Sequence, residues 1–208
     1  MNVWFATNNS HKKEELAAIL GRCLKIPSEE GISFDPDEIH LSFHENALLK
    51  ACELKKILDQ DSRFKDMENI VIADDSGLCV DALDGRPGVF SARYGDTEHK
   101  KLTSREKNLL LLKELGDNPN RGARFVCAMV LLFNDSRFII VQETVEGEIV
   151  KSEKYAKGEG GFGYDPIFLI PAAGLTMAEI SAEDKNRISH RGKAGKYIAE
   201  LLRGKNAI

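Results

Sequence analysis

Two adjacent carboxylates follow an apolar run in the segment that reads Ile-Val-Ile-Ala-Asp-Asp-Ser-Gly-Leu from position 70 to 78. Side chains of a regular strand alternate between faces, so we predict that a turn at Ser76 and Gly77 lets Asp74 and Asp75 approach one ligand. Carboxylates at a strand end suit Mg²⁺, which keeps several waters and binds one or two carboxylates together with substrate phosphates. The alternative is a solvated Asp-Asp-Ser-Gly turn without a ligand.

A candidate anion site follows the first apolar run, residues 2–6, which we predict to be a buried strand. Residues 7–12 form a polar loop before an amphipathic helix that ends near Gly21. The N–H groups of the loop and helix N-terminus favour an anion, and Lys12 and Lys13 oppose the helix dipole unless an anion lies between them. Alternatively, Ser10 only caps the helix and both lysines are exposed.

A further lysine stands on the next expected helix. Ser42 and Glu45 have the spacing of a capping box and predict a helix to about Asp59. Lys50 falls at the boundary of the apolar stripe of that helix, where lysines commonly extend to water. The acidic segment 28–40 precedes it, and one of its acids could reach a metal.

The segment 158–166 is dense in glycine and contains a formal G-x-G-x-x-G pattern. We reject a dinucleotide fingerprint, because that motif opens a helix, whereas Tyr164, Asp165 and Pro166 break a helix and 167–170 is typical of a strand. The remaining interpretation is a flexible loop that approaches a ligand closely, with Phe162 stacking on a base. Alternatively, the Phe162 ring fills the core.

Three cationic side chains and one histidine, which provide three or four donors, gather near the C-terminal helix. Residues 176–181 and 182–187 are short helical candidates, and a last helix runs from Ser189 to Gly204. The side chains at its entrance are Lys185, His190, Arg191 and Lys193. They oppose the helix dipole unless they share an anion or a polar ligand, and solvation at the surface is the alternative.

The remaining pattern predicts an α/β fold. A capping box at Thr103 begins a helix that ends at Gly116, and 124–133 and 137–145 predict an antiparallel hairpin joined by 134–136. Early strands and helices alternate and the hairpin comes later, so we expect one domain over 1–208 with two lobes and a mixed central sheet with flanking helices.

Composition narrows the function classes. The 208 residues carry a formal charge of −4, which argues against a general nucleic-acid binder. No apolar run approaches the roughly 18 residues that span a bilayer, and no signal peptide precedes Val3, so we expect a cytoplasmic protein without membrane contact. The four scattered cysteines favour buried thiols over disulfides or zinc.

Four separated segments together resemble the Ham1-type inosine triphosphate pyrophosphatase family. They are residues 7–12, 43–51 and 73–95, and 160–166 together with 189–192. The resemblance implies a mixed α/β fold whose two lobes enclose an active-site cleft, a homodimer and dependence on Mg²⁺. It also implies hydrolysis of deaminated purine nucleoside triphosphates to the monophosphate and pyrophosphate. Asn8 departs from the pattern, since many members have glycine there.

The resemblance also implies roles for individual residues. The phosphate-binding residues would be Thr7, Asn8, Asn9, Ser10, His11, Lys12 and Lys50. Asp75 would be a metal ligand and the base that activates water, with Asp74 and Glu38 as further metal ligands and Ser76 touching substrate. The base would contact Phe162, Gly163, Tyr164 and Asp165, with Lys185, His190 and Arg191 completing the pocket. Arginine only donates, so Arg191 at the purine 6-position would favour a 6-oxo group over an amino group.

Two other functions compete with this interpretation. A Maf-like pyrophosphatase would act on other bases, but it requires an arginine-rich loop after the first strand, and residues 7–12 contain no arginine. A non-enzymatic nucleotide sensor would use the same site without turnover. Pyrophosphate release from ITP separates a sensor from an enzyme.

Overall fold

The apolar runs of the sequence form the strands of one mixed sheet. The computed structural model describes residues 1–134 and 136–205, so Asp135 of the expected hairpin connection lies outside the described residues. The strands are β1 (Asn2–Phe5), β2 (Asn69–Val80), β3 (Gly122–Leu132), β4 (Phe138–Ile149), β5 (Phe168–Ile170) and β6 (Leu175–Thr176), in that spatial order. β1 pairs with β2 in parallel, whereas β5 is antiparallel to both β4 and β6. The predicted mixed sheet is confirmed.

The helices begin and end mostly where polar caps and glycines predict. They are α1 (Ser10–Leu20), α2 (Phe43–Gln60), α3 (Ser104–Leu115), α4 (Ala182–Ile188) and α5 (His190–Lys205). Thr103 and Glu106 form the expected capping box of α3, and Gly21 ends α1 in the left-handed conformation. The N-cap of α1 is Asn9 rather than Ser10. Within the part of the chain described, no helix combines the length and apolar character needed to cross a bilayer.

The chain divides into two compact units, each built from separate stretches of sequence. Unit 1 contains Met1–Asp75, Cys127–Glu143 and Arg191–Ile208, and unit 2 contains Ser76–Val126 and Thr144–His190. β2, β3 and β4 each contribute residues to both units. Asp75 and Ser76 are therefore neighbours in sequence but belong to different units.

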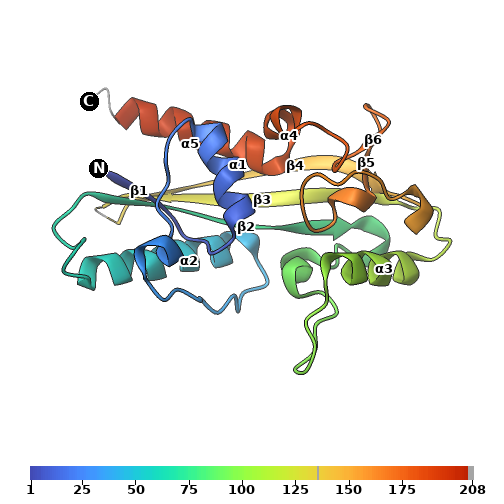
Figure 1. Cartoon of the computed structure of the whole chain (residues 1–208), viewed down its shortest axis with the longest axis horizontal. Coiled ribbons are helices and arrows are strands. Elements are labelled where there is room, and N and C mark those ends of the chain that lie inside the picture. The colour runs from blue at the N-terminus through green and yellow to red at the C-terminus, as the bar shows by residue number, and fades with distance from the viewer. Residues whose placement is uncertain (135, 206–208) are drawn as a thin grey trace. The chain divides into compact units, whose positions relative to one another are not determined.

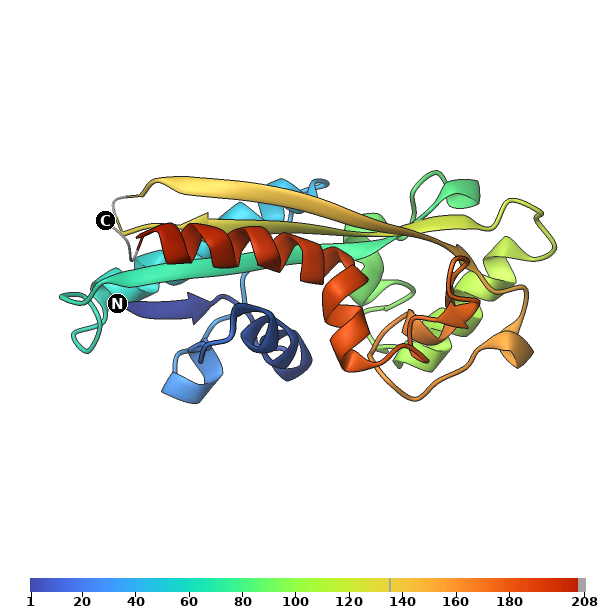
Figure 2. The ribbon, with the colours of Figure 1, turned by 90° about the horizontal axis from the view of Figure 1, so that it is seen from above.

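In unit 1, helices cover both faces of the strands (Figures 1 and 2). On one face, Ile70 and Ile72 of β2 pack with Leu16 of α1 and Ile198 of α5. On the other face, the partners of Val71 and Ala73 are apolar residues of α2, namely Ala47, Ala51, Leu54 and Leu58. The alternation of β2 thus assigns its successive residues to two separate apolar layers.

Unit 2 has its own apolar core. Its central members include Leu78 and Val80 of β2, Leu111 of α3, and Phe125 and Phe168 of β3 and β5. The rings of Phe125 and Phe168 lie 4.5 Å apart between centroids. This core supports α3 and the glycine-dense loop that precedes β5.

Two local expectations are wrong. Ser76 and Gly77 do not form a turn, because β2 continues to Val80 and buries Leu78 and Val80 completely. Residues 176–181 do not form a helix. Thr176 instead pairs with Leu169 in the sheet, and its hydroxyl donates to the carbonyl of Lys157.

The expectation that all four cysteines are buried is also wrong. Cys23 and Cys52 are exposed, Cys79 is half-buried and only Cys127 is buried. Burial raises the pKa of the Cys127 thiol to about 12. Because the thiolate is the reactive form, Cys127 is chemically protected.

We therefore expect a thiol reagent to modify Cys23 and Cys52 in the native protein and to reach Cys127 only after unfolding. Mass spectrometry of tryptic peptides, taken before and after denaturation, measures this order. Rapid modification of Cys127 in the native protein would contradict the packing of unit 1.

Candidate functional site

Consecutive positions of β2 place the two carboxylates on opposite faces of the strand. Asp74 follows the face of Ile70 and Ile72, and Asp75 follows the face of Val71 and Ala73. Both carboxylates are nearly inaccessible to solvent, at 1% and 4% exposure. Since no turn redirects them, each carboxylate meets a different set of partners, and the alternative of a solvated turn is wrong.

The Asp74 group consists of Asp74, Lys12, Glu15 and Arg191. Lys12 Nζ lies 3.0 Å from Asp74 Oδ1, and Arg191 donates from Nε and Nη2 to Asp74 Oδ2 at 3.2 and 3.0 Å. Arg191 Nη1 also donates to Glu15 Oε2 at 2.6 Å. Burial alone would raise the pKa of Asp74, but Lys12, Arg191 and Lys50 outweigh it and hold that pKa well below its usual range.

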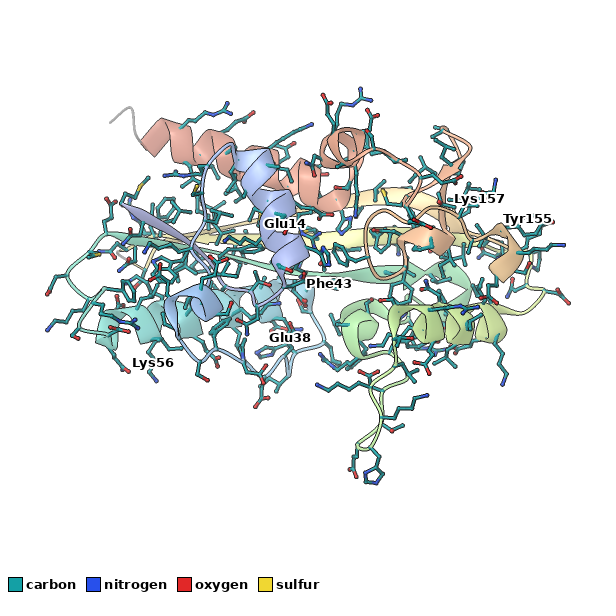
Figure 3. The ribbon with its side chains drawn as sticks, viewed as in Figure 1. Glu14, Glu38, Phe43, Lys56, Tyr155 and Lys157 are labelled. Atoms are coloured by element: carbon teal, nitrogen blue, oxygen red, sulfur yellow. The ribbon has the colours of Figure 1, made fainter. Side chains whose placement is uncertain are left out.

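The Asp75 group consists of Asp75, Glu38, Asn46 and Lys50. Lys50 Nζ lies 2.7 Å from Glu38 Oε1 and 3.5 Å from Asp75 Oδ1, and Asn46 Nδ2 donates to Asp75 Oδ2 at 3.1 Å. Burial raises the pKa of Asp75 and the charge of Glu38 adds to this, while Lys50 opposes both. Glu38 lies in the irregular segment before α2 (Figure 3).

Lys50 differs from its expected boundary position, because only 6% of it is exposed. The attraction of Asp75, Asp74 and Glu38 raises its pKa even though burial alone would lower it. Three carboxylates from two segments distant in sequence from Lys50 therefore keep this ammonium charged inside the protein.

Sequence reasoning assigned no role to Asn46 or Glu15. Asn46 is fully buried, and its amide also exchanges hydrogen bonds with the backbone N–H and carbonyl of His40. It thereby links the acidic segment before α2 to Asp75. The available signal was its spacing, since Asn46 precedes Lys50 by one helical turn and so shares its face of α2.

The loop before α1 provides backbone donors and a structured cap. Asn9 Oδ1 accepts from the N–H of Lys12 at 3.2 Å, and the N–H of Asn9 donates to Thr7 Oγ1 at 3.1 Å. Asn8 donates from Nδ2 to the carbonyl of Phe34, which gives this departure from the family pattern a structural role. Ser10 and His11 are exposed. The loop presents polar groups suited to an anion at a helix N-terminus.

The two first-turn lysines have carboxylate partners. Lys12 pairs with Asp74, and Lys13 Nζ lies 2.5 Å from Glu29 Oε1. These carboxylates offset the unfavourable interaction of both lysines with the dipole of α1. The expected alternative of two exposed lysines is wrong, because both are partly buried.

The Phe162 group of unit 2 consists of Phe162, Asp165 and Lys185. Lys185 Nζ lies 2.7 Å from Asp165 Oδ2 and 4.9 Å from the centroid of the Phe162 ring. The N–H of Phe162 donates to the same Asp165 oxygen at 2.8 Å. A Cβ at Gly161 would lie 2.0 Å from that oxygen, so glycine is required there. The half-buried Phe162 ring is held beside a charged pair.

Three further residues that the sequence predicted for the site, Tyr164, His190 and Ser76, do not belong to the Asp74, Asp75 or Phe162 group. Tyr164 is buried and donates from its hydroxyl to the carbonyl of Ser91 at 2.9 Å, so it anchors the loop. The buried His190 ring stacks on Phe125 with 5.0 Å between centroids. Ser76 is half-buried on β2. The C-terminal cations thus do not form one solvated cluster, since Lys185 and Arg191 are each paired with buried carboxylates.

Glu38 and Asp75 of unit 1 are candidate ligands for a divalent cation. Among residues 1–134 and 136–205, no three or more His, Cys, Asp or Glu side chains are grouped so that they could hold a metal ion. Mg²⁺ commonly binds only one or two protein carboxylates, with waters and substrate phosphates completing the shell. Glu38 and Asp75 fit this mode, because both approach the single cation Lys50 Nζ.

The chain belongs to the Ham1 family, whose model matches residues 3–201. This confirms the resemblance in the four sequence segments and leaves the Maf-like alternative without support.

Three similar proteins match this chain over nearly its whole length. The dITP/XTP pyrophosphatase of Treponema denticola is 43% identical over 205 residues, which cover 98% of this chain and 100% of that protein. The dITP/XTP pyrophosphatase of Halalkalibacterium halodurans is 42% identical over 97% of this chain and 100% of that protein. The structure of the Staphylococcus aureus Ham1 protein has 36% identity and a TM-score of 0.81, with coverage of 99% and 100%.

Proposed function

We propose that this chain is a Mg²⁺-dependent nucleoside triphosphate pyrophosphatase. Its substrates would be deaminated purine nucleotides (ITP and dITP, XTP and dXTP), converted to the monophosphate and pyrophosphate and so removed from the nucleotide pool. The names of the similar proteins support the reaction class. The observation that carries the proposal is the convergence of Asp75, Glu38 and Lys50 in unit 1. Asp74, the residue before Asp75 on β2, pairs with a second cation, Lys12.

The residues of unit 1 would have separate roles in the hydrolysis of the bond between the α- and β-phosphates. Glu38 and Asp75 would hold Mg²⁺, with Asp74 supporting the site, and the ion would polarise a phosphoryl oxygen when bound. Lys12 and the loop N–H groups would bind the phosphates, and Lys50 would offset negative charge that develops on the pyrophosphate. Asp75 would orient the attacking water and accept its proton. No protein nucleophile is needed.

The base would be bound by the Phe162 group. The half-buried Phe162 ring offers a stacking face, and the Asp165 and Lys185 pair offers an acceptor and a donor beside it. Arg191 would favour a 6-oxo purine, and the carboxylates of Asp74 and Glu15 would fix the plane of its guanidinium.

Replacing Phe162 with alanine should raise KM for ITP. Loss of stacking costs about 1–3 kcal/mol per base, which corresponds to about 5- to 150-fold in KM. Steady-state kinetics at saturating Mg²⁺ measure the change. Phe138→Ala, at an exposed aromatic of β4, is the matched control and should keep the parent KM. An unchanged KM in Phe162→Ala would mean that this ring does not contact the base.

A nucleotide panel tests the proposed function. We expect pyrophosphate release from ITP and XTP to exceed release from ATP and GTP, and chelation of Mg²⁺ to stop it. Tight ITP binding without pyrophosphate release would identify a sensor instead.

We also propose that the chain forms the homodimer that the family resemblance implies. Light scattering of the purified chain tests this oligomeric state.

A further inference from the structure

The glycine-dense loop 158–163 is fixed at its two ends. At its beginning, after Lys157 (Figure 3), the N–H of Gly160 donates to the carbonyl of Ala178 at 3.2 Å. A Cβ at Gly158 would lie 2.4 Å from the Ala178 backbone, so the contact there is close. At its end, Tyr164 is anchored to Ser91. Both anchors leave the middle of the loop, which carries Phe162, to be positioned by other contacts.

A cavity of about 530 Å³ lies between this loop and α3. Its lining includes Ser104, Asn108 and Leu112 of α3 and Gly160, Gly161 and Phe162 of the loop. The middle of the loop is therefore not supported by close packing over this surface, and a hydrogen bond across it has a large influence on where the loop lies.

Asn108 makes such a bond. Its Nδ2 donates to the carbonyl of Gly163 at 3.1 Å, from a side chain that is only 7% exposed. Gly163 has a φ of +65° and directly follows Phe162 in sequence. The Gly163 carbonyl belongs to the peptide between Gly163 and Tyr164, so this hydrogen bond holds the chain one residue after the position that carries the Phe162 ring.

Asn108 is otherwise unfavourable where it stands. Asparagine is a weak helix former, and the neighbouring buried positions of α3 are Leu111 and Leu112. Its Oδ1 is buried with no hydrogen-bond partner among the residues that the structure describes. A buried acceptor without a partner destabilises the fold. What this side chain gains among the described residues is the hydrogen bond from Nδ2 to the Gly163 carbonyl.

We propose that Asn108 is a positioning residue, which holds the loop at Gly163 so that Phe162 and the Asp165 carboxylate keep the geometry that binds the base. The inference rests on the proposed function for its effect on catalysis. It predicts that Asn108 acts on substrate affinity and on loop order, with little effect on the chemical step at Asp75.

Two variants and a control test this role. Asn108→Ala removes the donor, and Asn108→Asp keeps the shape while facing the Gly163 carbonyl with a second acceptor. Lys113→Ala alters an exposed residue of the same helix. Both Asn108 variants should raise KM for ITP about 3- to 10-fold, the factor expected for one net hydrogen bond, with kcat close to the parent value. Lys113→Ala should match the parent.

Hydrogen exchange provides a readout that does not depend on turnover. Peptides covering 158–164 should exchange about 3- to 10-fold faster in both Asn108 variants, while peptides of β1 and α2 in unit 1 stay protected. Unchanged exchange in the loop would overturn the proposal, whether or not KM rises. A parent protein that releases no pyrophosphate from ITP would refute the proposed function, and the exchange measurement would still decide the role of Asn108.

Discussion

Asp75→Asn should leave a folded protein that releases pyrophosphate from ITP about 10²- to 10⁴-fold more slowly than the parent, the range associated with loss of a positioned general base. The amide keeps the size of the side chain, and its oxygen can still accept the hydrogen bond from Asn46 Nδ2. It cannot accept a proton from water or contribute negative charge to a metal. Activity therefore falls for a chemical reason, while the packing around β2 is preserved.

Asp81→Asn is the matched control for this substitution. Asp81 is an exposed acid that follows β2 and pairs with Arg124, so its loss should leave kcat and KM near the parent values. Circular dichroism and thermal unfolding confirm that both variants fold. A turnover rate for Asp75→Asn within a few-fold of the parent would remove Asp75 from the chemistry.

Arg191→Met should lower the free energy of unfolding by about 3–5 kcal/mol, the usual cost of removing one partner from a buried ion pair. Arg191 is 2% exposed, and its guanidinium bonds to both Asp74 and Glu15. Without it, Asp74 is left inside unit 1 with Lys12 as its remaining strong cationic partner in the Asp74 group. Methionine keeps much of the apolar volume, so the loss reflects charge more than a cavity.

A double-mutant cycle separates this electrostatic effect from packing. Asp74→Asn combined with Arg191→Met should be less destabilised than the sum of the two single variants, by about 0.5–3 kcal/mol, because the second change removes the uncompensated charge. Arg203→Met, at an exposed position of α5, is the control. Strictly additive losses would show that Asp74 and Arg191 do not depend on each other.

Capping residues and glycines in the sequence correctly predicted helix boundaries that depend only on neighbouring residues. The capping box at Thr103 and Glu106 began α3 where expected, and Gly116 ended it. The prediction of a turn at Ser76 and Gly77 was wrong because contacts with residues distant in sequence determine the backbone conformation there. Burial of Leu78 and Val80 in the core of unit 2 outweighs the turn preference of a Ser-Gly pair. Residues 176–181 failed as a helix for a similar reason, since pairing with β5 outweighs local preference.

In the candidate site, too, the sequence predicts features that depend on neighbouring residues but not those that depend on distant contacts. Residue types identified Asp74, Asp75, Lys12 and Lys50 as charged groups at element ends or boundaries. Their burial depends on partners between 12 and 117 residues away in sequence, such as Glu38 for Lys50 and Arg191 for Asp74. Periodicity gives the face of an element but not the group that it meets. Glu15 and Asn108 were missed because single polar residues on helices carry no distinctive pattern, and for Asn46 the one signal was its spacing of one helical turn from Lys50.

Product analysis of ITP hydrolysis tests the central claim most directly, because the charged groups around Asp75 are proposed to release pyrophosphate in one step. Phosphorus NMR of ITP incubated with the protein and Mg²⁺ should show IMP and pyrophosphate appearing together, without IDP or inorganic phosphate. Formation of IDP and inorganic phosphate, or no turnover of bound ITP, would contradict the account.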